Sequence, residues 1–224
     1  PFAYTMDPER LIQETGGAKY EDFTFPEADS DTGVYFLTGE KTYANTSNTL
    51  QAINKSSCNV TLTVKVKATQ NTTNDINLAT SSTLSTTDPE LYLGLKVGTA
   101  AQAVSTTEAT VTKTVAGAAG NFETVYDTTE SKYKYQEKAS ATTWKAINIS
   151  MTGAVNEKAI TADTTAPTVE VTWSYAKAAD GATVDTGDQV DYTVVPAATD
   201  PEISDIDAFD KDNPADVVIT FSVG

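Results

Sequence analysis

The stretch Val60-Thr61-Leu62-Thr63-Val64-Lys65-Val66-Lys67 decides the fold class of this chain. Apolar and polar residues alternate strictly along it, so the three valines and Leu62 share one face while threonines and lysines occupy the other. A period of two residues is typical of a β-strand with one face on a core and the other in water. We therefore predict a half-buried sheet around this strand.

The same alternation recurs along the chain. It is clearest at 147–151, at 169–175, where Trp173 lies on the apolar face, and at 217–223. Weaker strands are predicted at 34–37, 49–53, 91–97, 109–115, 122–126, 133–137 and 189–195. Turns rich in Gly, Asn, Asp and Ser separate these segments. A short helix is predicted at residues 7–14, with Pro8 at the first helical position.

Many short strands without helical periodicity predict an all-β protein, built as an antiparallel β-sandwich, jelly-roll-like, with short helical insertions. The length of 224 residues fits one β-rich domain, and no repeat or linker divides it. We assign residues 1–14 to an N-terminal extension and candidate donor strand, and residues 15–224 to a single β-sandwich domain.

Composition argues against most catalytic chemistry. The chain has no histidine and one cysteine, Cys58. Histidine is the usual general acid or base near neutral pH and the commonest transition-metal ligand. A single thiol allows neither an internal disulfide nor a Cys-x-x-Cys zinc site. Paired carboxylates of the glycosidase kind arise easily by chance among 31 acidic residues. The composition therefore predicts a structural or binding protein and not an enzyme.

The chain is strongly acidic, with a net charge of −16. Such a field repels nucleic acid and anionic lipid, so neither is expected as a partner. No apolar run is long enough for a membrane helix. The field favours cations, and Ca²⁺ prefers carboxylate oxygens. The alternative is that the acidity only keeps a surface protein soluble.

The densest acidic segment, residues 200–216, is the first candidate for a Ca²⁺ site. Its spacing is not that of an EF-hand, since it has no central glycine and no glutamate at the twelfth position. The alternative is a solvated loop extended by its own like charges. The candidate metal ligands are Asp200, Glu202, Asp205, Asp207, Asp210 and Asp212. A weaker candidate set is Glu27, Asp29 and Asp31.

The first residues form an apolar alternating strand that Asp7-Pro8 ends. Phe2, Tyr4 and Met6 share one face, and they are the candidate donor-strand residues. A terminal strand of this kind either pairs inside its own sheet or completes a neighbour's sheet by β-strand addition. Burial is worth about 1.5–3 kcal/mol for each such side chain, so the second arrangement would give a strong subunit contact.

Several features indicate an extracellular or cell-surface location. Few cysteines, abundant Thr, Ser and Asn, and strong acidity are shared with exported bacterial and archaeal surface proteins. The chain starts at Pro1 without a methionine, so we expect that an N-terminal segment was removed. Five Asn-x-Ser/Thr sequons occur, although chance explains most of them in so Asn- and Thr-rich a chain: Asn45, Asn54, Asn59, Asn71 and Asn148.

Residues 49–64, Thr-Leu-Gln-Ala-Ile-Asn-Lys-Ser-Ser-Cys-Asn-Val-Thr-Leu-Thr-Val, combine a strand, an Asn-x-Ser turn and an alternating Val strand. This pattern resembles the secreted TasA/camelysin-like fibre proteins of Gram-positive bacteria, which have relatives among archaeal bundling pili. The strands at 91–95 and 166–173 are similar to those of related exported proteins, so the resemblance covers roughly half of the chain.

The resemblance implies a jelly-roll subunit, exported by signal cleavage, that polymerises when an N-terminal strand inserts into the next subunit. Cannula-like tubules are similar in plan and would add Ca²⁺ at the interface. Some camelysin-type relatives are described as proteases, but this chain has no His-Glu-x-x-His motif, so that activity is not carried over.

We therefore expect a structural subunit of an extracellular filament or tubule, a homopolymer of the cell surface or of a biofilm. The alternative is a monomeric cell-surface binding module for glycans or a host protein. That alternative requires an exposed aromatic patch around Trp144 or around Tyr126, Tyr133 and Tyr135.

Overall fold

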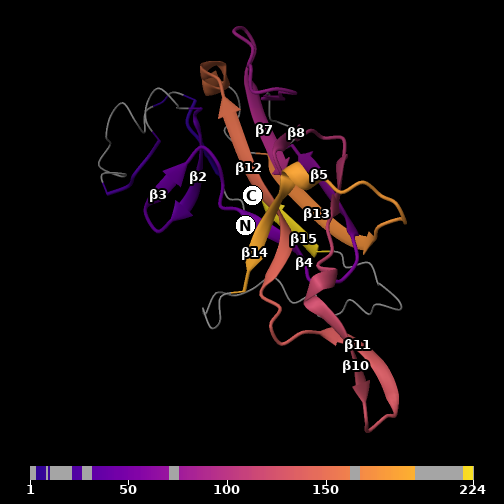
Figure 1. Ribbon diagram of the computed structural model, residues 1–224. Coiled ribbons are helices and arrows are strands. Elements are labelled where there is room, and N and C mark those ends of the chain that lie inside the picture. Colours follow the sequence, from indigo (N-terminus) through magenta and orange to yellow (C-terminus); the bar gives the residue numbers. More distant parts are fainter. Residues whose placement is uncertain are drawn as a thin grey trace.

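The computed structural model is nearly all β, as the sequence predicts (Figure 1). Single turns of 3-10 helix interrupt the strands: η2 (Ala119–Asn121), η3 (Glu157–Thr161) and η4 (Thr186–Asp188). None of the helical turns in the described ranges has the length and apolar character of a membrane-spanning helix. The structure describes residues 4–8, 10, 22–26, 32–70, 76–161, 167–194 and 219–223.

The first of two large sheets is built around β12 (Thr143–Val155), the longest strand. One edge of β12 pairs with β4, and the other pairs first with β14 and then with β7. Every pairing is antiparallel except that of β6 with β7. The remaining strands are β4 (Leu50–Asn54), β6 (Asn77–Leu78), β7 (Glu90–Val97), β8 (Ala100–Ala103) and β14 (Gln189–Thr193).

The second large sheet has four antiparallel strands in the order β15-β13-β5-β9. These strands are β5 (Val60–Thr69), β9 (Ala109–Val115), β13 (Thr168–Lys177) and β15 (Ile219–Val223). If the short β6 and β8 are set aside, the strands of the two sheets alternate along the chain. The first sheet contains β4, β7, β12 and β14, and the second contains β5, β9, β13 and β15. The chain therefore crosses repeatedly from one sheet to the other, which is the jelly-roll-like arrangement that the alternating strands predict.

The core lies between these two sheets. In β5, Val60, Leu62, Val64 and Val66 are all buried, so the deciding stretch of sequence faces the core as predicted. The apolar face of β13 is buried too, including Trp173. The opposite wall comes from β7 and β12, whose buried side chains are Leu91, Leu93, Leu95, Val97, Ile147, Ile149 and Met151. Interdigitation of the two faces makes the main hydrophobic core, and a small second cluster contains Ala79, Tyr92 and Ala154.

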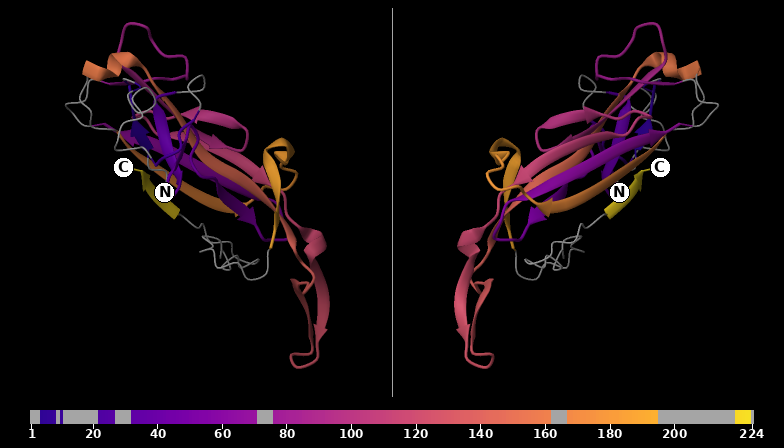
Figure 2. Two further views of the ribbon diagram at one scale, coloured as in Figure 1. Left: turned by 90° about the vertical axis from the view of Figure 1, so that its left-hand side faces the viewer. Right: turned by 90° about the vertical axis from the view of Figure 1, so that its right-hand side faces the viewer.

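Two smaller sheets are attached to this sandwich. One has the order β1-β2-β3, formed by β1 (Tyr4–Met6), β2 (Val34–Gly39) and β3 (Thr42–Ala44). The other is a hairpin of β10 (Phe122–Asp127) and β11 (Lys132–Glu137), which projects from one end of the molecule (Figure 2). The short strands β3, β6 and β8 were not predicted. Most of the predicted helix at 7–14 lies outside the described residues.

Candidate functional site

The N-terminal strand β1 pairs with β2 of its own chain. The ladder is antiparallel, with Tyr4 opposite Phe36, Thr5 opposite Tyr35 and Met6 opposite Val34. Of the two arrangements open to a terminal apolar strand, the single chain therefore adopts the intramolecular one. Phe2, the first candidate donor residue, lies outside the described residues.

Tyr4 and Met6 act as core side chains, as their alternation predicts. Both are partly buried and pack against the main hydrophobic cluster. The Tyr4 hydroxyl donates a hydrogen bond of 2.7 Å to the carbonyl oxygen of Pro167, and its ring centroid lies 6.3 Å from that of Phe36. Burial raises the pKa of the Tyr4 phenol. The strand is thus anchored by side chains more than by its three-residue ladder.

Packing around β1 is incomplete. A cavity of about 260 Å³ lies beside the strand, and its lining is mainly apolar: Tyr4, Thr5, Met6, Pro8, Ile76, Val155 and Ala159. This pocket is partly open to the surface, so the groups that line it lack protein neighbours on that side. The contact between β1 and the body of the molecule is therefore less well packed than the central core.

The candidate Ca²⁺ ligands at 200–212, and the weaker set at 27, 29 and 31, lie outside the described residues. Within the described ranges, no group of three or more Cys, Asp or Glu side chains is arranged to hold a metal ion. The Ca²⁺ site therefore stays a prediction.

The β10–β11 hairpin gathers aromatic side chains on one of its faces, which we call the aromatic face: Phe122, Tyr126, Tyr133 and Tyr135. Residues directly opposite in an antiparallel ladder lie on the same face, and Tyr126 is opposite Tyr133. Their ring centroids are 5.1 Å apart and nearly perpendicular. Phe122 and Tyr135 stack with centroids 5.4 Å apart. Such pairs stabilise the hairpin through their ring quadrupoles and their buried area.

The two parts of the predicted aromatic patch have different environments. Trp144 is buried, and its ring meets that of Phe122 edge-on with centroids 6.0 Å apart, so it anchors the hairpin to β12. Tyr126, Tyr133 and Tyr135 are 48%, 74% and 41% exposed. An exposed aromatic patch is therefore present at the tyrosines and not at Trp144.

The distal part of the hairpin, residues 126–135, is charged on its other face but has no net charge. Its ionisable side chains other than tyrosine are Asp127, Glu130, Lys132 and Lys134. Lys134 bridges Asp127 at 2.6 Å and Glu130 at 2.8 Å, and Lys132 pairs with Glu130. The hydrogen bond from Lys134 lowers the pKa of Asp127, and that from Lys132 lowers the pKa of Glu130. Both carboxylates therefore stay ionised and compensated at neutral pH.

Asn54 has a structural role that the sequence did not reveal. Its buried amide nitrogen donates to the carbonyl oxygens of Cys58, Val115 and Ala116, and its oxygen accepts from the Ser56 amide. These bonds tie the end of β4 to the following turn and to the end of β9. Because Asn54 is 3% exposed, this sequon is not accessible to a glycan in the folded chain.

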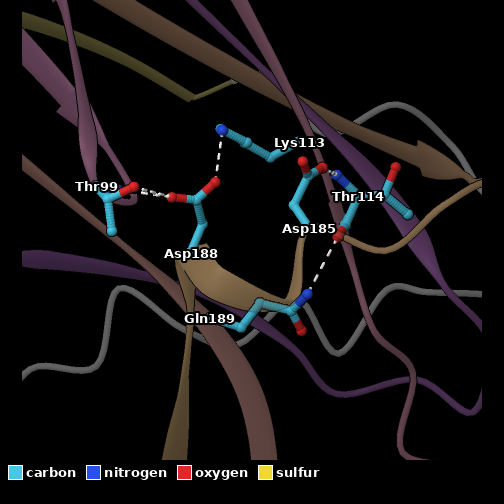
Figure 3. Close-up of polar contacts among 6 residues, drawn as sticks. All are labelled: Thr99, Lys113, Thr114, Asp185, Asp188 and Gln189. Atoms are coloured by element: carbon cyan, nitrogen blue, oxygen red, sulfur yellow. Dashed lines mark hydrogen bonds and ion pairs between the residues drawn. The ribbon is translucent and has the colours of Figure 1, made fainter.

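A polar cluster around η4 joins the edges of the two large sheets (Figure 3). Asp188 accepts hydrogen bonds from Lys113 of β9 at 2.5 Å and from both the amide and the hydroxyl of Thr99. Thr99 follows Gly98, whose φ of +76° makes the tight β7–β8 turn. On the same edge of β9, the Asp185 carboxylate accepts from the Thr114 amide.

This cluster protects a sheet edge. Gln189 accepts from the Ala116 amide and donates to the Thr114 carbonyl, so edge groups of β9 are hydrogen-bonded by side chains. An edge covered in this way is a poor template for another strand. The cluster is therefore a structural device that closes the Thr114–Ala116 end of this edge.

Loss of the Asp188 carboxylate should destabilise the fold in a pH-dependent way. Hydrogen bonds from Lys113 and Thr99 hold the pKa of Asp188 at about 2, below its ordinary value of 3.8. We expect Asp188→Ala to lower the free energy of unfolding by about 1–2 kcal/mol at pH 7. A lowered pKa contributes stability above the unfolded-state value and loses it as pH falls through the folded value. The difference should therefore shrink between about pH 4 and pH 2.

Urea unfolding of both proteins at pH 7 and near pH 2 measures this difference. Asp191→Ala is the matched control, because the Lys145–Asp191 pair is well exposed, and we expect a change of less than about 0.5 kcal/mol. An Asp188→Ala effect of the same size at both pH values would contradict the assignment.

No protein-family model, no curated protein and no solved structure matches this chain. The resemblance to TasA/camelysin-like fibre proteins therefore rests on the sequence patterns alone and stays a hypothesis. The all-β fold with its mainly antiparallel sheets is given by the structure of this chain.

Proposed function

We propose that this protein is a structural subunit of an extracellular filament or tubule, in which the N-terminal strand of one subunit pairs with β2 of the next. The observation that carries the proposal is the state of β1. In the part of the chain that the structure describes, β1 has three residues, pairs with β2 alone and lies beside a pocket of about 260 Å³. A strand held in this way is well suited to exchange between subunits.

Exchange of β1 would cost little in contacts. The β1–β2 hydrogen-bonding ladder and the packing positions of the Tyr4 and Met6 side chains are the same whether the strand comes from the same chain or from a neighbour. Exchange of identical elements is a low-cost route to association, and a head-to-tail contact that does not close generates a filament. In the exchanged state Phe2 extends the same apolar face along the sequence.

The composition supports the same proposal. The missing histidine and single cysteine leave few means for catalysis, and the Thr-rich acidic surface suits a protein exposed to water outside the cell. With a net charge of −16, subunits repel one another at low ionic strength. Ca²⁺ at the acidic segment 200–212 would reduce this repulsion, so we include the ion in the test.

Negative-stain electron microscopy of the purified chain, with and without added Ca²⁺, tests the proposed function. We expect regular filaments or tubes, more abundant with Ca²⁺ because the ion offsets the repulsion between acidic subunits. Chelation should then shorten or loosen them. Dispersed particles under both conditions would overturn the proposal.

A second candidate is the monomeric cell-surface binding module, which the exposed tyrosines of the aromatic face favour. It predicts a single monomer peak in sedimentation and a clear hit on a glycan array or with a host protein. The hit should weaken when Tyr133, the most exposed of the three, is replaced by threonine.

A further inference from the structure

We propose that the aromatic face of the β10–β11 hairpin docks on a second copy of this chain, at the β2–β3 surface around Leu37. This inference rests on the proposed function and deepens it, since it names a second contact between neighbouring subunits. The contact is head-to-tail, because the two surfaces lie on different parts of the chain.

The distribution of exposed apolar side chains points to these two surfaces. Among the described residues, five large hydrophobic side chains are exposed. Tyr126, Tyr133 and Tyr135 lie on the aromatic face, and Val125 lies on the other face of the hairpin. The fifth is Leu37 of β2, which is 47% exposed. Exposed apolar groups that gather on one face mark an interaction site more often than scattered ones do.

Leu37 is the exposed side chain above a small aromatic cluster, in which Tyr35 is fully buried and Tyr43 is partly buried. It lies opposite Tyr43 in the β2–β3 ladder, on the face of the small sheet that also carries Tyr35. Tyr43 stacks on Phe25 with ring centroids 4.9 Å apart, and Tyr35 meets Phe25 edge-on at 5.2 Å. A hairpin seated on Leu37 would therefore meet a firmly packed support.

The two surfaces lie toward opposite ends of the molecule. Figure 1 shows β10 and β11 projecting from the sandwich at the bottom of the view, while β2 and β3 lie at the upper left. Two complementary surfaces placed in this way form a heterologous contact, which propagates unless the rotation between subunits closes a ring. The geometry is the one that a filament needs.

Charge explains why a second copy, although acidic, is an acceptable partner. Residues 126–135 contain two acidic and two basic side chains, all in ion pairs, and residues 34–44 contain Glu40 and Lys41. The distal part of the hairpin and residues 34–44 are thus neutral on a chain of net charge −16, while the base of the hairpin adds Glu123 and Glu137. Contact through the two neutral parts brings two acidic molecules together with the least electrostatic repulsion.

The hairpin itself gains from being covered. In the described structure β10 pairs with β11 alone, and an isolated two-stranded hairpin is marginally stable in water. Its ring pairs also suit a protein partner better than a sugar. The ring planes of Tyr126 and Tyr133 are inclined by 66° to each other, and the rings of Phe122 and Tyr135 stack on each other. The four rings therefore do not form one flat platform.

Sedimentation velocity tests the contact on a chain that cannot exchange β1. This locked chain carries Cys58→Ser together with Met6→Cys and Val34→Cys, which face each other in the β1–β2 ladder and form a disulfide when oxidised. We expect its sedimentation coefficient to rise with concentration. The double substitution Tyr126→Thr and Tyr133→Thr should weaken this self-association by about tenfold or more.

Val125→Thr is the matched control, because it removes an exposed apolar group from the opposite face of the same hairpin. We expect it to change the association by less than about twofold. Threonine retains strand propensity in every variant, and circular dichroism and thermal unfolding check that the hairpin variants stay folded.

Mixing two variants separates a head-to-tail contact from a symmetric one. Leu37→Thr should weaken self-association as the tyrosine pair does. An equimolar mixture of the Leu37→Thr chain and the tyrosine-substituted chain should form dimers again, because one intact hairpin meets one intact Leu37 surface. Failure of the mixture to associate, while the locked parent does, would overturn the head-to-tail assignment.

Other outcomes distinguish this inference from the proposed function. A locked chain that stays monomeric at all concentrations would overturn the hairpin contact, whether or not the wild-type chain forms filaments. Absence of wild-type filaments would overturn the proposed function but leave the sedimentation result to decide the hairpin contact. Loss of glycan binding in the tyrosine variant, without any change in self-association, would assign the aromatic face to a glycan and overturn the inference.

Discussion

A disulfide that ties β1 to β2 of the same chain is expected to abolish filament formation, and its reduction is expected to restore it. Met6 and Val34 are directly opposite in the antiparallel ladder, where Cα atoms are about 4.5–5.5 Å apart. That separation suits a disulfide. The bond holds the strand in the intramolecular arrangement that the single chain adopts, so no strand remains to pair with a neighbour.

The measurement is electron microscopy of the oxidised and the reduced protein, in the Cys58→Ser background. The single substitutions Met6→Cys and Val34→Cys are the controls, because each perturbs packing to a similar extent without forming the bond. Deletion of residues 1–6 provides an independent variant, and it should leave a folded chain that forms no filaments and associates only through the weaker hairpin contact. Normal filaments from a double variant oxidised as a monomer, with the disulfide shown to be intramolecular by non-reducing electrophoresis, would falsify the exchange of β1.

Gly117→Ala is expected to lower the free energy of unfolding by about 3 kcal/mol, the largest effect of a single methyl group that we predict. A Cβ atom at this position would lie 2.4 Å from the carbonyl carbon of Cys58 and 2.7 Å from its amide nitrogen. These are backbone atoms, which cannot rotate away as the end of a side chain can. The clash must therefore be relieved by moving one of two chain segments.

Neither segment is free to move. The Gly117 amide donates to the side-chain oxygen of Asn59, and the Ala118 amide donates to the Ser56 carbonyl. Asn54 adds bonds from its buried amide to both segments. The place where β4, the following turn and the end of β9 meet is thus fixed by hydrogen bonds that a shift would lengthen or break.

Gly120→Ala is the control for this prediction. No atom lies within 4 Å of a Cβ built at Gly120, so the substitution should change the unfolding free energy by less than about 0.5 kcal/mol. Guanidinium unfolding of the two variants and the parent gives the comparison. Equal destabilisation by both substitutions would show that the close approach to Cys58 is not the cause.

Much of the fold could be predicted from periodicity. The strict alternation at 60–67 and 169–175 corresponds to β5 and β13, with the expected residues buried. The strands β3, β6 and β8 were missed because two to four residues are too few to show a period. The strands of the projecting hairpin were predicted, but its projection was not, since residues that alternate in the same way form core strands elsewhere.

The candidate site was predictable to a smaller extent. The apolar alternation of Tyr4 and Met6 correctly indicated that these side chains pack on the core. The same alternation is expected whether the strand pairs with its own chain or with a neighbouring subunit. Trp144 and Tyr133 both lie in strand patterns, and the structure alone separates the buried ring from the exposed one. Burial depends on what packs against a strand, and the strand's own residues do not specify this.

The sequence by itself determined the strand content, the faces that β5 and β13 bury, and a composition poor in catalytic residue types. These are local properties, because a period of two and a residue count need no knowledge of distant segments. The tertiary structure decided that β1 pairs with β2, that four aromatic side chains gather on one face of a hairpin, and that Lys113 meets Asp188. Each of these joins separate segments of the chain, and only the packed core brings such segments together.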